Sequence, residues 1–143
     1  MSRIALVGLR VALGLLFLWA ALSKVPDLAA FAQDVANYRT IPPALVPYAA
    51  AAVVGIEIVT GIALVTGIAT RPAAILASIL LVAFTAFLAQ ALLRGIDLRC
   101  GCFGTNEPAS WWTVLRDLLL LVAALAVARL GQRRPRQDSP LTA

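Results

Sequence analysis

A soluble domain of 143 residues needs more polar surface than a chain that is 62% hydrophobic and 13% charged provides, so the composition excludes a soluble globular protein. The absence of histidine excludes a Ser-His-Asp triad, a Cys-His nucleophile pair and histidine-ligated haem, and two cysteines are too few for a disulfide scaffold. The net charge of +5 does not indicate a nucleic-acid partner, because the basic residues lie mainly at the ends of apolar blocks, as in membrane proteins.

Four apolar blocks follow one another along the chain, at residues 4–22, 44–70, 73–93 and 111–130. Each is long enough for a membrane-spanning helix, which needs roughly 20 apolar residues. The blocks contain unbroken apolar runs such as 118–128 rather than the alternating pattern of barrel strands. The sequence therefore predicts an all-α integral membrane four-helix bundle over residues 1–131, followed by a basic, disordered cytoplasmic tail at 132–143.

The segment between the first two blocks predicts a short additional helix. Asp27 follows Pro26 and is suited to cap the start of this helix. Its apolar side chains then fall on one face, and they are Leu28, Phe31, Val35 and Tyr38. This pattern indicates an interfacial helix on the outer membrane surface, ended by Ile41-Pro42-Pro43.

The later connections predict how the spans pack. A tight turn around Thr70-Arg71-Pro72 makes the second and third spans antiparallel neighbours. Small residues four apart, as in Gly8 to Ala12, Ala51 to Gly55 and Ala63 to Gly67, indicate close helix packing. Gly55 and Gly61 flank Glu57, and we expect them to let a neighbouring helix approach that carboxylate.

The distribution of basic residues predicts the orientation. With the N-terminus in the cytoplasm, the inner side carries Arg3, Arg10, Arg71, Arg129, Arg133, Arg134 and Arg136. The outer side then carries Lys24, Arg39, Arg94, Arg99 and Arg116. Because cytoplasmic segments are richer in Lys and Arg, we expect both termini in the cytoplasm and the 94–110 connection outside.

Both cysteines lie in this outer connection, in the sequence Arg99-Cys100-Gly101-Cys102-Phe103-Gly104. Their alpha carbons lie within ~7 Å of each other even in an extended chain, and a bend at Gly101 brings them within reach of a disulfide. Such a small ring is strained and easily reduced, and the nearby arginines favour the reactive thiolate. Cys100 and Cys102 are therefore the candidate catalytic residues, although a structural staple or a Cu(I) site also fits two close cysteines.

Charged residues inside the apolar blocks form a second candidate site. Glu57 lies near the middle of the second block and needs a partner, and Arg116 or Arg10 is the expected one. Lys24, at the outer end of the first block, either snorkels to the interface or approaches the Cys loop. We interpret Glu57, Arg116 and Lys24 as a polar pocket for a proton or a quinone head group, or as an ion-paired packing contact.

These features together resemble a known family. Its pattern is matched by Ser23-Lys24, Asp27, Phe31, Tyr38, Pro42, Glu57, Gly61, Arg94-Gly95, Cys100-Gly101-Cys102-Phe103-Gly104 and Arg116-Asp117. Over roughly residues 3–130 the chain resembles the methylamine-utilisation protein family MauE, within the wider DoxX-like membrane group. The resemblance implies a multi-pass protein of the bacterial inner membrane. It also implies a role in maturing methylamine dehydrogenase, a disulfide-rich enzyme, together with a periplasmic thioredoxin-like protein.

The resulting hypothesis is a thiol-disulfide oxidoreductase on the outer face of the membrane. A thioredoxin-like partner exchanges electrons with the Cys100–Cys102 pair, and a membrane quinone reoxidises the pair. Two cysteines on one side cannot themselves carry electrons across ~30 Å of hydrocarbon, so the chemistry is expected on that side alone. The alternatives are a non-enzymatic membrane anchor for a periplasmic partner and a soft-metal binding protein.

Overall fold

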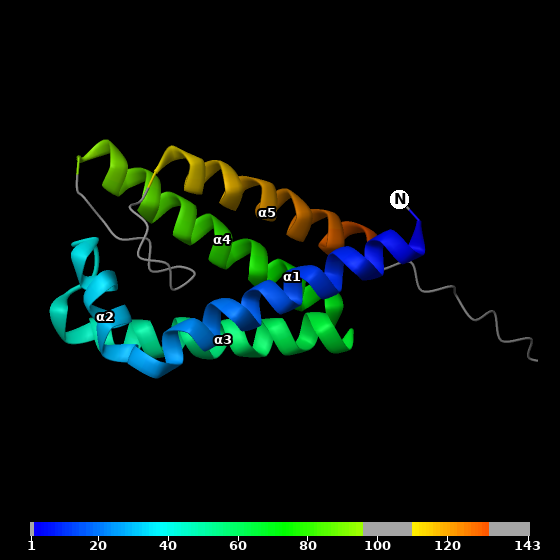
Figure 1. The fold of residues 1–143 in the computed structure, drawn as a ribbon, viewed down its shortest axis with the longest axis horizontal. Helices are drawn as coiled ribbons and strands as arrows, with labels where there is room; N and C mark the ends of the chain where they lie inside the picture. The colour runs from blue at the N-terminus through cyan, green and yellow to red at the C-terminus, as the bar shows by residue number, and fades with distance from the viewer. Residues whose placement is uncertain (1, 96–109, 132–143) are drawn as a thin grey trace, which may run out of the picture.

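The computed structural model describes residues 2–95 and 110–131, and the regular structure in these ranges is helical (Figure 1). The helices are α1 (Arg3–Lys24), α2 (Leu28–Asn37), α3 (Val46–Thr66), α4 (Thr70–Leu93) and α5 (Trp111–Leu130). Short 3₁₀ turns at Val25–Asp27 and Pro43–Leu45 precede α2 and α3. The predicted tail at 132–143 lies outside the described residues.

The helix ends follow from local chemistry. The Ser2 hydroxyl accepts a hydrogen bond from the amide of Ala5 at 3.2 Å and caps α1. The predicted interfacial helix is present as α2, and Asp27 caps it by accepting from the amide of Ala30 at 2.9 Å. A 3₁₀ turn at Val25–Asp27 is all that separates α1 from α2, so the chain bends there without an extended loop.

The turn between α3 and α4 lies earlier than the sequence predicted. Helix α3 ends at Thr66 because Gly67 adopts a left-handed conformation with φ +80°, which glycine accepts without steric cost. Helix α4 already begins at Thr70, so the expected turn at 70–72 was wrong by about one helical turn. Pro72 lies in the first turn of α4. Backbone N–H groups in the first turn have no acceptor within the helix, so proline costs no hydrogen bond there.

The long helices pack in antiparallel pairs. Helix α1 packs mainly along α3, and α4 packs mainly along α5, while α3 also contacts α4 and α1 also contacts α5. Figure 1 shows the start of α1, the α3–α4 turn and the end of α5 at one end of the molecule. The principal core contains Leu13, Phe17, Leu64, Ala73, Ala74, Ala77, Leu80, Leu81, Ala124, Val127 and Ala128.

Helices α1 and α3 make their closest approach at two glycines. A Cβ on Gly61 would lie 2.7 Å from Cγ of Leu18 and 2.9 Å from the carbonyl oxygen of Gly14. A Cβ on Gly14 would lie 2.9 Å from the carbonyl oxygen of Gly61. The expected role of Gly61 is confirmed, whereas that of Gly55 and Gly8 is wrong, since a Cβ there would meet nothing within 4 Å.

The outer surface of the helices is apolar. Trp19, Val59, Ile79 and Val122, one from each long helix, are between 59% and 68% exposed. Three stretches among the described residues are long and apolar enough to cross a membrane, and they are Arg3–Asn37, Pro43–Thr66 and Thr70–Leu93. An apolar exterior on helices of this length is stable in lipid and unfavourable in water, so the chain is a membrane protein.

Candidate functional site

The centre of the candidate site is a buried ion pair between α1 and α3. Nζ of Lys24 lies 2.8 Å from Oε1 and 2.9 Å from Oε2 of Glu57, and it also donates to the carbonyl of Ala20 at 3.1 Å. Each charged side chain is only 2% exposed. Two charges removed from water this completely are stable only when each is paired and hydrogen bonded, and this geometry provides both.

The predicted partner of Glu57 was therefore wrong. Both carboxylate oxygens of Glu57 face Lys24, whereas Arg116 on α5 pairs with its neighbour Asp117, with Nη2 3.3 Å from Oδ1. Helix α5 packs mainly against α4 and α1, whereas the main neighbours of α3 are α1, α2 and α4. Of the three residues predicted to share a pocket, the structure thus brings Glu57 and Lys24 into direct contact.

Arg10, the other expected partner, lies near the opposite end of α3. A Cβ on Gly67 would meet the Arg10 guanidinium, which shows how closely Arg10 packs against the end of α3. Gly67 is ten residues beyond Glu57 along the sequence, or ~15 Å along a helix. In the described part of the chain, Nε of Arg10 and Oγ1 of Thr60 are the buried side-chain atoms without a hydrogen-bond partner.

Lys24 does not snorkel to the interface. The residue is 3% exposed, and its Nζ lies 5.2 Å from the centroid of the Phe31 ring of α2. A cation within about 6 Å of an aromatic face is attracted by the ring quadrupole. Lys24 therefore contacts side chains or backbone of α1, α2 and α3 at the same point.

This ion pair also fixes how far α1 extends beside α3. Lys24 is the last residue of α1, but its partner Glu57 lies ~16 Å along α3 from Val46, at ~1.5 Å per residue. Because α1 ends opposite the middle of α3, the first half of α3 is left to pack against α2. Phe31 of α2, together with Ala21, Ala50 and Val54, forms a second small core there.

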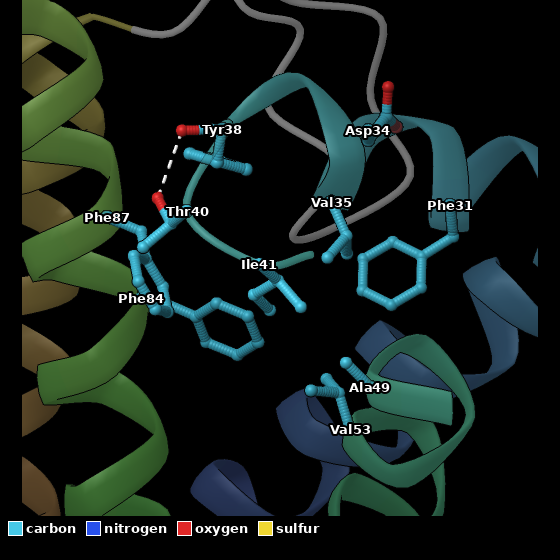
Figure 2. Close-up of a pocket in the computed structure, with 10 residues that line it drawn as sticks. All are labelled: Phe31, Asp34, Val35, Tyr38, Thr40, Ile41, Ala49, Val53, Phe84 and Phe87. Atoms are coloured by element: carbon cyan, nitrogen blue, oxygen red, sulfur yellow. Dashed lines mark hydrogen bonds between the residues drawn. The ribbon is translucent and has the colours of Figure 1, made fainter. Parts of the chain in front are cut away.

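An apolar pocket of about 70 Å³ lies next to this second core. Figure 2 shows its wall of side chains from α2, α3 and α4 and from the segment after α2. The lining residues are Phe31, Asp34, Val35, Tyr38, Thr40, Ile41, Ala49, Val53, Phe84 and Phe87. The Tyr38 and Phe87 rings are packed with centroids 6.1 Å apart, and the Thr40 hydroxyl donates to the carbonyl of Tyr38 at 3.0 Å.

Sequence reasoning found part of this pocket. The apolar face predicted for α2 supplies Phe31, Val35 and Tyr38, but the same pattern placed Leu28 with them, and Leu28 is exposed. Phe84 and Phe87 were missed. The available signal was their spacing of three, which puts the two aromatic rings of this block on one face of α4.

The candidate catalytic residues Cys100 and Cys102 lie outside the described residues. The described ends of their connection are Gly95, just after α4, and Ser110, just before α5. Figure 1 shows the end of α4 and the start of α5 at the same end of the molecule as α2. The cysteine-bearing segment is therefore tethered at the end that also holds the aromatic pocket.

Comparison with known proteins adds a family relationship. A family model described as "Methylamine utilisation protein MauE" matches residues 1–130. The chain is 40% identical over 124 residues to the methylamine utilization protein MauE of Paracoccus denitrificans. The aligned region covers 85% of this chain and 67% of that protein. No solved structure matches the chain.

Proposed function

Because this chain belongs to the MauE family, we propose that it acts in methylamine utilisation as a membrane-bound thiol-disulfide exchange protein. The Cys100–Cys102 pair exchanges electrons with a thioredoxin-like protein outside the cytoplasm. The exchange serves the maturation of a disulfide-rich enzyme such as methylamine dehydrogenase. The observation that supports the proposal is that the end of α4 and the start of α5, which the cysteine-bearing connection joins, lie at the same end of the molecule as α2.

The proposal includes four membrane spans. Helix α5 has 20 residues, which gives about 30 Å at 1.5 Å per residue, the thickness of the hydrocarbon layer. It packs along α4, one of the stretches that are long and apolar enough to cross a membrane, and therefore extends through the same layer. Four spans place both termini on one side, and the excess of arginine at the terminal end makes that side the cytoplasm of a bacterial inner membrane.

The electrons and protons of the exchange reaction balance, and the reaction needs no group of this chain other than its two cysteines. A thiolate of the partner attacks the Cys100–Cys102 disulfide, so the S–S bond breaks and a mixed disulfide forms. The second partner thiol then attacks the mixed disulfide, which releases Cys100 and Cys102 as a dithiol and leaves the partner oxidised. Two electrons and two protons have moved from the partner to this chain.

Renewed turnover requires a two-electron acceptor, and a membrane quinone supplies this two-electron, two-proton chemistry when bound. The Lys24–Glu57 pair, which the sequence predicted as part of its site, does not fit a quinone, because the two side chains are paired with each other and only 2% exposed. The pocket between α2, α3 and α4 does not fit a quinone either, because its walls are almost entirely apolar and the Thr40 hydroxyl already donates to the carbonyl of Tyr38.

The proposal is tested by reconstituting the protein in lipid vesicles with a reduced thioredoxin-like partner from the same cell envelope. We expect stoichiometric oxidation of the partner and appearance of a Cys100 or Cys102 mixed disulfide, trapped when the other cysteine is replaced by serine. Cys100→Ser and Cys102→Ser each abolish partner oxidation. If either variant oxidises the partner at the rate of the unaltered chain, the proposal is wrong and a membrane anchor is the better interpretation.

A further inference from the structure

We infer that the turn between α3 and α4 is a binding site for the phosphate of an anionic phospholipid, and that Arg10 is the residue that binds it. This turn, residues 67–69, lies at the end of the molecule opposite to α2, together with the start of α1 and the end of α5 (Figure 1). The site is therefore remote from the cysteine-bearing connection and independent of thiol-disulfide exchange.

Arg10 is a charged residue in the third turn of α1, inside the apolar block 4–22. Its Nε is buried without a hydrogen-bond partner, and no ion pair joins it to another residue of the described ranges. The guanidinium packs against the end of α3, since a Cβ on Gly67 would lie 2.9 Å from Cζ of Arg10. A charge in an apolar span is stable only beside an opposite charge or in water, so this position predicts an anion next to the turn.

Two more arginines and a helix start make the same end of the molecule electropositive. Arg71 lies in the first turn of α4, and Arg129 lies in the last turn of α5. The end of α5 reaches the turn itself, since a Cβ on Gly131 would lie 3.4 Å from Cγ2 of Thr70. Helix α4 begins there without a side-chain cap, and the unpaired N–H groups of a helix start attract anions.

Within residues 2–95 and 110–131, no carboxylate lies at this end to offset the positive charge. The acidic side chains of these ranges lie on or just before α2, in the middle of α3 and in the first two turns of α5, and they are Asp27, Asp34, Glu57 and Asp117. The planar fork of an arginine donates to two phosphate oxygens at once. The end of the molecule around Arg10 therefore fits a phosphate group.

The surroundings of Arg10 favour a lipid over a dissolved phosphate. Ile4 and Val7 of α1 are 85% and 50% exposed, and Ile68 of the turn is 71% exposed. Ile4 and Val7 lie ~5–9 Å beyond Arg10 along α1, at ~1.5 Å per residue. Apolar side chains this exposed are stable in lipid, so Arg10 lies at the boundary between the acyl chains and the head groups.

The charge of the site favours a lipid with a net negative head group. A zwitterionic head group would bring its ammonium close to Arg10, Arg71 and Arg129, and like charges repel. A head group of the phosphatidylglycerol type carries the phosphate without that ammonium. Basic sites between spans on the cytoplasmic side are typical of lipids with anionic head groups, and the proposed orientation places this end on that side.

The experiment uses the full chain in detergent and measures lipid binding by native mass spectrometry. Dioleoyl phosphatidylglycerol and dioleoyl phosphatidylcholine are titrated separately, and we expect the unaltered chain to bind the first roughly tenfold more tightly. Arg10→Gln removes the charge-assisted contact to the phosphate and lowers this selectivity roughly tenfold. The matched control is Arg3→Gln, which makes the same charge change at the start of the same helix and alters the selectivity less than about twofold.

A second variant, Arg129→Gln, keeps the test decisive if Arg10→Gln does not fold, because Arg129 is exposed and its replacement does not disturb the core. We expect it to lower the selectivity about threefold. Unchanged selectivity in the variants that fold, or equal affinity of the unaltered chain for the two lipids, overturns the inference. Glycerol 1-phosphate that binds as tightly as phosphatidylglycerol shows a site for a dissolved phosphate and also overturns it.

Discussion

The strongest prediction concerns the Lys24–Glu57 pair, which the structure buries between α1 and α3. Replacing Lys24 by Met leaves the Glu57 carboxylate without its two donor contacts at 2.8 and 2.9 Å. Replacing Glu57 by Leu removes the carboxylate that pairs with the ammonium of Lys24. The hydrogen bond from Lys24 to the carbonyl of Ala20 remains. Removing one partner of a buried ion pair costs about 3–5 kcal/mol, so we expect each single variant to lose that much stability.

The double variant Lys24→Met/Glu57→Leu distinguishes a paired charge from general packing. If the two losses were independent, the double variant would lose about 6–10 kcal/mol. The double variant removes both charges and fills the space with apolar side chains of similar size. We therefore expect its free energy of unfolding to lie within about 1–2 kcal/mol of that of the unaltered chain. The coupling energy between the two positions is then several kcal/mol.

The assay is reversible unfolding in mixed micelles, in which the fraction of SDS is increased and helix content is followed by circular dichroism. Leu22→Met and Val59→Leu are the matched controls, because both side chains are 64% exposed on the same two helices and their replacement changes stability by less than about 0.5 kcal/mol. A double variant that loses the full sum of the single losses would refute the pairing argument.

Three further predictions follow from local geometry. Gly61→Ala destabilises the bundle by about 1–3 kcal/mol in the same assay, whereas Gly55→Ala, with open space around its Cβ, is neutral or gains up to about 1 kcal/mol. Asp27→Ala removes the cap of α2 and costs about 0.5–2 kcal/mol, seen as faster amide hydrogen exchange confined to α2. A membrane-impermeant thiol reagent added to intact spheroplasts labels Cys100 and Cys102 after mild reduction, and labelling only after lysis would reverse the proposed orientation.

Several features of this molecule follow from local sequence patterns. The apolar blocks predict the long helices, and α5 occupies the predicted range 111–130. Asp27 caps α2 because an acidic side chain before an amphipathic run needs only its own neighbours to act. Gly67 ends α3 early because a left-handed residue is available there, a signal that the longer apolar run through residue 70 obscured.

The ion pair and the pocket could not be predicted in the same way, because they depend on the register between helices. Depth along ideal helices made Arg116 a plausible partner for Glu57, but depth says nothing about which helices are neighbours. The helix arrangement gives α3 the neighbours α1, α2 and α4, which leaves Lys24 as the partner and Arg116 beside Asp117. A single sequence contains no direct information on that arrangement.

The length of α1 links the ion pair to the pocket. If Lys24 lay at the level of Val46, α1 would cover the whole of α3, and α2 would have no space beside Ala49 and Val53. Because the pair joins the end of α1 to the middle of α3, the chain bends at Val25–Asp27 and α2 covers the first half of α3 instead. The bend brings Phe31 over Lys24 on one side and into the cavity on the other. A buried charge pair thereby places an aromatic wall at the end of the molecule where α4 ends and α5 begins.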